Sequence, residues 1–153
     1  MNIDELREEL IIDEGKRLDV YMCTGDPPKA TVGIGHMIRD ADPESSLAVG
    51  DTITEERCQE LFDEDIEGVI EDCDRLIRNF PLLEPEAQKI CANMMFNLGM
   101  NRLGKFNNFL NALNEDPPNY TLAASEMRDS RWYRQVTNRA ERLARRMEDL
   151  DRG

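Results

Sequence analysis

Helical periodicity runs through the middle of the chain over a long stretch. Within residues 54–79, apolar side chains recur at intervals that place them on one face of an α-helix. The apolar positions are Cys58, Leu61, Phe62, Ile66, Val69, Ile70, Cys73, Leu76 and Ile77. This is long for a chain of 153 residues, since the mean helix of a globular protein has about 12. We therefore predict that residues 54–79 connect two lobes.

The segments before this helix predict a small mixed lobe, residues 1–53. Residues 2–13 have the spacing of a short amphipathic helix that ends before Gly15. Residues 17–38 combine apolar positions with glycine and proline, which indicates short strands joined by turns. Residues 39–53 are polar and predict a loop.

The segment after the long helix, residues 80–153, predicts a helical lobe. Pro85 begins a helix that ends near Gly99 and has the apolar composition of a buried element. Shorter helices are expected around 105–114, 121–129 and 137–149. The predicted fold class is α+β and mostly helical, in a single domain whose two lobes are joined by the long helix.

The chain is strongly acidic. Its 32 Asp and Glu residues outnumber its 19 Lys and Arg residues, which gives a formal net charge of −13. Nucleic acid is therefore not expected as the main ligand, because phosphate binding depends on concentrated basic residues. No apolar run approaches the roughly 20 residues needed to cross a bilayer, and the first residues lack a secretory signal. We expect no membrane insertion and a chain that starts in the cytoplasm.

Four cysteines and one histidine restrict metal and redox chemistry. No two cysteines form a C-x-x-C pair, and a lone histidine does not complete a common zinc set, so neither metal nor cofactor is expected. Disulfides are also not expected in a cytosolic chain of this size. Cys58, Cys73 and Cys91 stand among apolar residues and are interpreted as small core side chains.

Two short segments near the N-terminus contain candidates for chemistry. Glu14 follows an apolar helix and precedes a Gly-rich region, where burial would favour the protonated form that a catalytic acid needs. The alternative is a surface carboxylate beside Asp13. Residues 33–36 (Gly-Ile-Gly-His) contain two glycines, which let the backbone approach a ligand or a neighbouring strand closely.

Taken together, three ordered segments resemble the active-site stretch of phage-type lysozymes of the T-even class. They are Asp13-Glu14-Gly15-Lys16-Arg17-Leu18, Tyr21-Met22-Cys23-Thr24 and Thr31-Val32-Gly33-Ile34-Gly35-His36. Later segments continue the resemblance in order over nearly the whole chain. They are Ile53-Thr54 with Leu61-Phe62 and Asp65, Asn93-Met94 with Phe96-Asn97-Leu98-Gly99, and Ser130-Arg131-Trp132-Tyr133 with Asn138-Arg139-Ala140. A lysozyme-like fold with two lobes is implied.

The resemblance implies a muramidase that cleaves the β-1,4 bond between N-acetylmuramic acid and N-acetylglucosamine in peptidoglycan. In that family a glutamate, an aspartate and a threonine line a cleft between the lobes. Carried onto this sequence, Glu14 protonates the leaving glycosidic oxygen and Thr31 positions the attacking water. Attack by water inverts the anomeric centre and requires carboxyl groups about 6.5–9.5 Å apart.

The resemblance also implies supporting and substrate-contacting roles. His36 is implied to be a structural histidine paired with Asp65, and Arg139 is implied to pair with the catalytic glutamate. The residues implied to line or adjoin the substrate cleft are Met37, Phe96 and Asn97.

The sequence departs from the family pattern at Cys23, where the family has an aspartate, and the loop from Cys23 to Thr31 is two residues longer than usual. A free thiol has a pKa near 8.5, so a thiolate at neutral pH needs a cause, for which Lys16, Arg17 or Lys29 are candidates. Three explanations remain open: Cys23 acts as thiolate base or nucleophile, Asp26 replaces the carboxylate, or Glu14 and Thr31 work alone.

The implied biological role is that of an endolysin, a monomer that acts on peptidoglycan glycan strands and lyses the host cell. It would wait in the host cytoplasm for a separate phage holin to open the inner membrane. Two other hypotheses are a non-catalytic lysozyme fold that binds peptidoglycan, and an acidic protein whose charge mimics nucleic acid.

Overall fold

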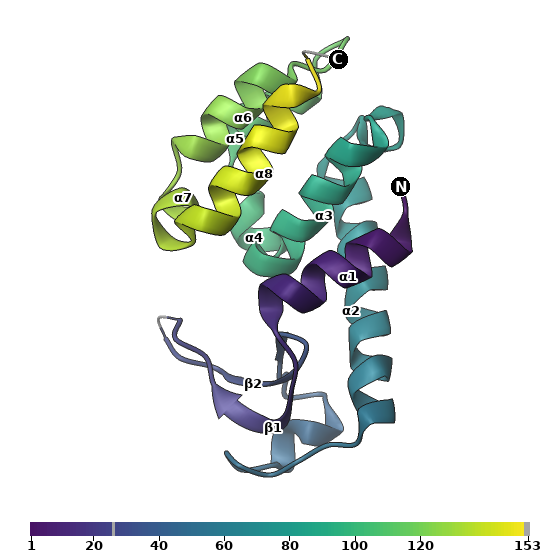
Figure 1. The fold of residues 1–153 in the computed structure, drawn as a ribbon, viewed down its shortest axis with the longest axis vertical. Coiled ribbons are helices and arrows are strands. Elements are labelled where there is room, and N and C mark those ends of the chain that lie inside the picture. Colours follow the sequence, from purple (N-terminus) through teal and green to yellow (C-terminus); the bar gives the residue numbers. More distant parts are fainter. Residues whose placement is uncertain (26, 152–153) are drawn as a thin grey trace. The chain divides into compact units, whose positions relative to one another are not determined.

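The computed structural model describes residues 1–25 and 27–151 (Figure 1). Its α-helices are α1 (Ile3–Glu14), α2 (Glu55–Leu76), α3 (Pro85–Leu98), α4 (Met100–Leu103), α5 (Asn107–Leu113), α6 (Tyr120–Arg128), α7 (Arg131–Gln135) and α8 (Thr137–Asp149). The strands are β1 (Arg17–Met22), β2 (Ala30–Gly33) and β3 (His36–Met37), and 3₁₀ helices lie at Pro43–Ser46 and Phe80–Leu82. A small antiparallel sheet followed by helices confirms the predicted α+β, mostly helical fold class.

The chain divides into two compact units. The sheet unit is Arg7–Glu67, and the helical unit is Met1–Leu6 with Gly68–Gly153. Both boundaries lie inside helices, one in α1 and the other in α2. The division into lobes at residues 1–53, 54–79 and 80–153 stays a prediction.

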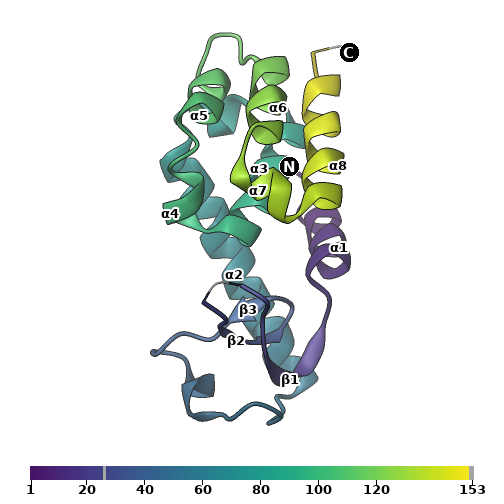
Figure 2. The ribbon, with the colours of Figure 1, turned by 90° about the vertical axis from the view of Figure 1, so that its left-hand side faces the viewer.

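The sheet unit has its apolar core on one face of the sheet. The strands β1, β2 and β3 (Figure 2) are antiparallel in that order. Val20, Val32 and Leu61 of α2 form a buried cluster against them. Each fully buried valine contributes about 2 kcal/mol of hydrophobic stabilisation. Because side chains alternate along a strand, Tyr21 and Thr31, which are direct Cα partners, lie on the opposite face.

A bulge in β1 determines which residue faces Thr31. The register of β1 on β2 shifts between Arg17 and Tyr21. In the shifted stretch, β1 bonds instead to the segment before α2, where the Val20 amide donates to the Asp51 carbonyl (2.8 Å). Bulges commonly re-aim side chains beside functional sites, and here the shift places Tyr21 opposite Thr31.

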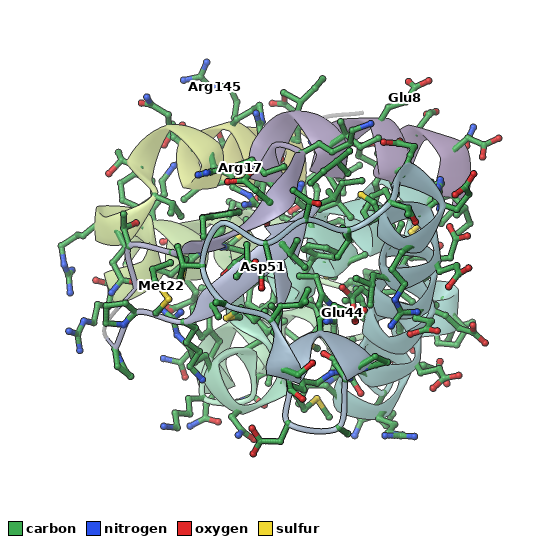
Figure 3. All side chains as sticks on the ribbon, turned by 90° about the horizontal axis from the view of Figure 1, so that it is seen from below. Glu8, Arg17, Met22, Glu44, Asp51 and Arg145 are labelled. Atoms are coloured by element: carbon green, nitrogen blue, oxygen red, sulfur yellow. The ribbon has the colours of Figure 1, made fainter. Side chains whose placement is uncertain are left out.

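The polar segment 39–53 is more ordered than the predicted loop. It contains the 3₁₀ helix at Pro43–Ser46, and the carboxylate of Glu44, labelled in Figure 3, is 6% exposed. Arg57 of α2 donates to both Glu44 oxygens at 3.0 Å. This bidentate pair lowers the pKa of Glu44 and ties the segment to α2, which compensates for burying the charge.

The helical unit is built around one apolar cluster. Its fully buried members include Ile77, Ile90, Met94, Leu103, Leu113, Leu143 and Met147. In the same unit, Arg128 of α6 donates to Glu141 and Glu148 of α8, each at 2.8 Å. The network joins α6 to α8 and holds both carboxylates beside one guanidinium.

Several details differ from the sequence-based expectations. The long helix ends at Leu76, before residue 79, and the short helices α4 and α7 were not predicted. All four cysteines are free, and Cys58, Cys73 and Cys91 are buried as predicted. None of the described helices has the length and apolar character that crossing a membrane requires.

Candidate active site

Glu14 lies at the end of α1 against the turn between β2 and β3. Its side chain is half-buried, and the turn approaches it through Gly35, whose φ is +63°. A Cβ atom on Gly35 would lie 2.8 Å from Glu14 Oε1 and 3.1 Å from Glu14 Cδ. The second glycine of the Gly-Ile-Gly-His segment thus lets the backbone approach the candidate acid on α1, rather than the ligand or neighbouring strand that the sequence suggested.

Cys23 and Thr31 are brought together at the end of the β1–β2 pair. The ladder continues beyond Met22, because the Cys23 amide donates to the Lys29 carbonyl at 2.9 Å. The Thr31 hydroxyl donates to the same carbonyl at 3.0 Å and also lies within hydrogen-bond reach of the Cys23 side chain. Thr31 is 3% exposed, whereas Cys23 is half-buried.

The pKa of Cys23 lies below its ordinary value, and the cause is hydrogen bonding. A hydrogen bond with the backbone of Gly25 makes the largest contribution, ahead of smaller ones from Lys29 and from the Thr31 hydroxyl. Burial acts in the opposite direction but is outweighed. These polar groups stabilise the thiolate, which is the reactive form of a cysteine.

Two of the basic side chains expected to lower the Cys23 pKa are engaged elsewhere. Lys16 pairs with Glu55 at 2.7 Å, and Arg17 pairs with Asp19 at 2.6 Å. Lys29 acts on the thiol through its backbone. Asp26, the alternative carboxylate, lies outside the described residues.

His36 is enclosed between two carboxylates. Its Nδ1 lies 2.7 Å from Asp65 Oδ2 and its Nε2 lies 2.8 Å from Asp42 Oδ2. Asp65 is the partner that the family resemblance implied, whereas Asp42 had no signal in the sequence. Asp42 also accepts from the Arg39 amide at 2.8 Å. His36 thus links β3 to the following segment through Asp42 and to α2 through Asp65.

The pKa shifts of this cluster follow from burial and hydrogen bonding. Burial alone lowers the pKa of His36, but the hydrogen bonds to Asp65 and Asp42 outweigh it, and the net pKa is raised. For Asp42, burial raises the pKa, but the Arg39 amide and His36 outweigh it and the net pKa is lowered.

The other predicted site residues lie in different places. Met37 of β3 is 46% exposed and is the Cα partner of Thr31. In the helical unit, Phe96 is half-buried, and Asn97 accepts a hydrogen bond from the Trp132 indole at 2.7 Å. The hydrogen bond from Trp132 orients the side chain of Asn97. The contact of Asn97 with substrate stays a prediction.

Arg139 is oriented by a buried asparagine of the helical unit. Its Nε donates to Asn93 Oδ1 at 2.9 Å, and Asn93 is fully buried in α3. The predicted pair of Arg139 with Glu14 joins the two units and stays a prediction.

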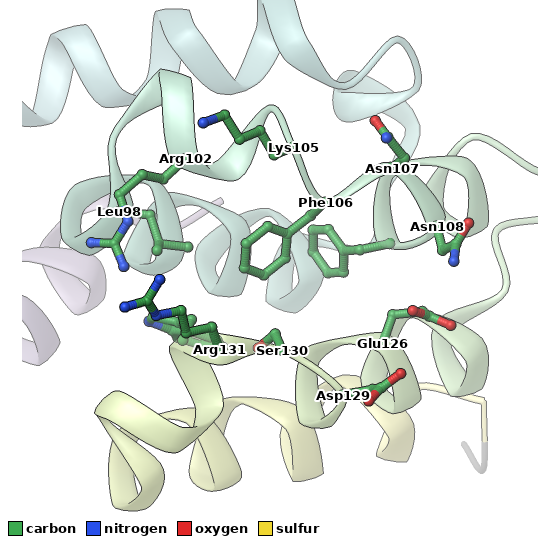
Figure 4. Close-up of a pocket in the computed structure, with 12 residues that line it drawn as sticks. Leu98, Arg102, Lys105, Phe106, Asn107, Asn108, Glu126, Asp129, Ser130 and Arg131 are labelled. Carbon is green, nitrogen blue, oxygen red and sulfur yellow. The ribbon is translucent and has the colours of Figure 1, made fainter.

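A cavity of about 520 Å³ lies in the helical unit (Figure 4). Phe106 is in its wall, Arg102 and Arg131 lie toward one end, and Glu126 and Asp129 lie toward the other. The cavity therefore has basic and acidic ends. Among residues 1–25 and 27–151, no group of three or more His, Cys, Asp or Glu side chains is arranged to hold a metal ion.

The family of the chain follows from a comparison with known protein families. The phage lysozyme family model matches residues 12–149, which include Glu14, Cys23, Thr31 and all the helices from α2 to α8. The chain belongs to the phage lysozyme family. The resemblance inferred from the short segments is thereby confirmed.

Relatives with curated names agree with membership of the phage lysozyme family. "Probable T4-type lysozyme 2" of Dictyostelium discoideum is 26% identical, over 92% of this chain and 92% of its own length. "Endolysin" of Salmonella phage P22 is 34% identical over 57% of this chain and 56% of its own. "Peptidoglycan hydrolase gp36" of Pseudomonas phage phiKMV is 28% identical over 92% of this chain, which spans 15% of that protein.

Gly35→Ala is expected to reduce the activity of this phage lysozyme family member more than its stability. The positive φ costs an alanine about 1–2 kcal/mol, and the added methyl group forces the Glu14 carboxyl to move. A misplacement of about 1 Å lowers the rate roughly 10²-fold. Gly50→Ala is the matched control, because its φ is +94° and no atom lies within 4 Å of the new methyl group. The rate of peptidoglycan cleavage and the thermal unfolding of both variants are measured. Equal cleavage rates for Gly35→Ala and Gly50→Ala would show that Gly35 does not position the Glu14 carboxyl.

The His36 cluster predicts a pH-dependent stability. A raised His36 pKa stabilises the fold below the unfolded value of about 6.5, and that contribution is lost as the pH rises through the folded pKa. The lowered Asp42 pKa stabilises the folded state above about pH 4, and this stabilisation is lost as the pH falls through the folded pKa of Asp42. Urea unfolding should therefore give a free energy of unfolding that falls as the pH rises above about 6.5 and through the folded pKa of His36. His36→Asn should flatten this slope, and the exposed control Asp40→Asn should keep it; an unchanged slope in His36→Asn would contradict the assignment.

Proposed function

We propose that this chain is a muramidase, a peptidoglycan hydrolase that cleaves the β-1,4 bond between N-acetylmuramic acid and N-acetylglucosamine. Membership of the phage lysozyme family supports the proposal. So do relatives that carry the names lysozyme, endolysin and peptidoglycan hydrolase. The proposal adds the bond specificity and the roles of individual residues.

One observation carries the assignment of the site. Glu14, Cys23 and Thr31 belong to the same compact unit, where Gly35 packs against the Glu14 carboxyl and the Lys29 carbonyl accepts from both the Thr31 hydroxyl and the Cys23 amide. A proton donor and a separate base or nucleophile are the two groups that glycoside hydrolysis requires. The thiolate, stabilised by its hydrogen bonds, fills the position of the missing carboxylate.

In the proposed reaction, Glu14 donates its proton to the leaving glycosidic oxygen as the bond from that oxygen to the anomeric carbon breaks. Cys23 then acts in one of two ways. As a base, the thiolate takes a proton from a water molecule oriented by the Thr31 oxygen; the water oxygen bonds to the anomeric carbon as the glycosidic bond breaks, and the product is inverted. As a nucleophile, it forms a carbon–sulfur bond that water hydrolyses in a second step, and the configuration is retained.

We propose further that Met37, Phe96 and Asn97 contact the glycan strand and that Arg139 orients Glu14. His36, with Asp65 and Asp42, holds β3 in place. The molecule acts as a monomeric endolysin, which a separate holin releases from the host cytoplasm to the cell wall. The endolysin among the relatives supports this role.

A cell-wall turbidity assay tests the proposal. The wild-type protein should clear a suspension of purified cell walls, whereas a protein that only binds glycan would sediment with the walls and leave the turbidity unchanged. Binding without clearing would favour the non-catalytic alternative. Absence of both binding and clearing would contradict the proposed function.

A further inference from the structure

The turn between β2 and β3 packs closely against two helices of the sheet unit. A Cβ atom on Gly33 would lie 3.3 Å from Cys58 Sγ of α2, which is closer than an ordinary van der Waals contact. A Cβ atom on Gly35 would lie 2.8 Å from Glu14 Oε1 of α1. The same short turn therefore touches the proposed acid at one glycine and a buried cysteine at the other.

One face of α2 supports this turn and the strands on either side of it. Cys58, Leu61 and Asp65 are three and seven residues apart, which places them on the same face of the helix. Leu61 packs in the buried cluster with β2, and Asp65 Oδ2 lies 2.7 Å from His36 Nδ1 of β3. Because β2 and β3 are both attached to α2, the position of the turn depends on the side chains of this face.

Cys58 is the part of this face that limits the turn at Gly33. After the sulfur, the nearest atoms to a Cβ on Gly33 are Ile53 Cδ1 at 3.9 Å and Cys58 Cα at 4.0 Å, which are ordinary contact distances. The thiol is fully buried, and burial raises its pKa, whereas a hydrogen bond with the Ile34 backbone of the turn acts in the opposite direction. The size of this side chain therefore has a consequence beyond filling the core.

We infer that Cys58 is a positioning residue, whose size sets where the turn between β2 and β3 places Gly35 against the Glu14 carboxyl. This inference rests on the proposed function, since it concerns the acid of that reaction. Because Cys58 is fully buried, a larger side chain cannot expand into solvent and displaces the turn instead. Gly35 then moves relative to the carboxyl, and a misplacement of about 1 Å lowers a rate roughly 10²-fold.

The first test enlarges two buried cysteines of α2. Cys58→Val branches the side chain next to the turn and should lower kcat for peptidoglycan cleavage at least about 10-fold, with KM within about threefold of wild type. Cys73→Val makes the same change at an equally buried position of the helical unit and should keep kcat within about twofold. Both values are measured on folded protein, as checked by thermal unfolding. Equal kcat values for Cys58→Val and Cys73→Val would overturn the inference.

A rescue experiment tests the same contact without enlarging residue 58. Gly33→Ala puts a methyl group 3.3 Å from Cys58 Sγ, and a shift of a few tenths of an ångström to relieve it should lower kcat about fivefold. Adding Cys58→Ala removes the sulfur and should return kcat to within about twofold of wild type. An alanine at a φ of +68° is equally strained in both proteins, so the rescue isolates the contact. A Gly33→Ala variant as active as wild type, or a rescue that Cys73→Ala gives equally well, would overturn the inference.

A spectroscopic measurement separates this inference from the proposed function. The ¹³C NMR signal of the Glu14 carboxyl carbon should move in Cys58→Val and in Gly33→Ala and stay in place in Cys73→Val, whether or not the protein cleaves glycan. An unchanged Glu14 signal in the first two variants would overturn the inference even for an active muramidase. If the wild type does not cleave peptidoglycan, the proposed function fails, and the Glu14 signal alone decides whether residue 58 positions the carboxyl.

Discussion

Replacing Glu14 by glutamine is expected to lower the rate of peptidoglycan cleavage by about 10³-fold or more, since the amide cannot donate the proton that the leaving oxygen needs. The folded state should survive the change. Glu14 is in the last turn of α1, where a negative charge interacts unfavourably with the helix dipole. Thermal unfolding of Glu14→Gln should therefore correspond to a stability within about 1 kcal/mol of wild type.

Glu8→Gln makes the same chemical change in the same helix, at an exposed position. Its rate should equal that of wild type. A lytic Glu14→Gln variant would contradict the acid assignment.

Cys23 variants carry the second large expected effect. Cys23→Ser should lose about 10²-fold in rate, because a serine hydroxyl stays protonated where the thiol ionises. Cys23→Asp restores a carboxylate and should stay within about tenfold of wild type. The acid limb of the pH profile should also move to lower pH in Cys23→Asp, since an aspartate ionises below even a lowered thiol pKa. A fully active Cys23→Ser variant would reject the role of the thiolate.

Alkylation offers an independent measure of the same role. Burial raises the pKa of Cys73 to about 12 and raises those of Cys91 and Cys58, whereas the pKa of the half-buried Cys23 is lowered. Iodoacetamide should therefore modify Cys23 first and abolish lysis as it does so. Modification of another cysteine first, or full activity after Cys23 is capped, would count against the proposal.

Much of the fold could be predicted because the spacing of apolar residues along the sequence matches the faces that the helices bury. The apolar spacing within 54–79 predicted α2, and Gly15 correctly marked the end of α1. The short helices α4 and α7 gave no such signal, because one turn of helix has no repeat to recognise. The bulge in β1 was also beyond prediction, since at this point β1 bonds to Asp51, which lies far along the chain.

The site was predicted through the order of its motifs, and its chemistry needed the structure. The sequence indicated a basic side chain as the cause of a reactive Cys23, whereas the Gly25 backbone makes the largest contribution. Asp42 was missed because only the fold brings it to His36. Tyr21 lies within one of the family motifs, but its position opposite Thr31 depends on the bulge.

Analysis of the reducing ends released from purified peptidoglycan tests the central claim most directly. Wild-type protein should release new ends at N-acetylmuramic acid, and Glu14→Gln should release none above background. New ends at N-acetylglucosamine, cleavage of peptide bonds alone, or equal release by the two proteins would contradict the account.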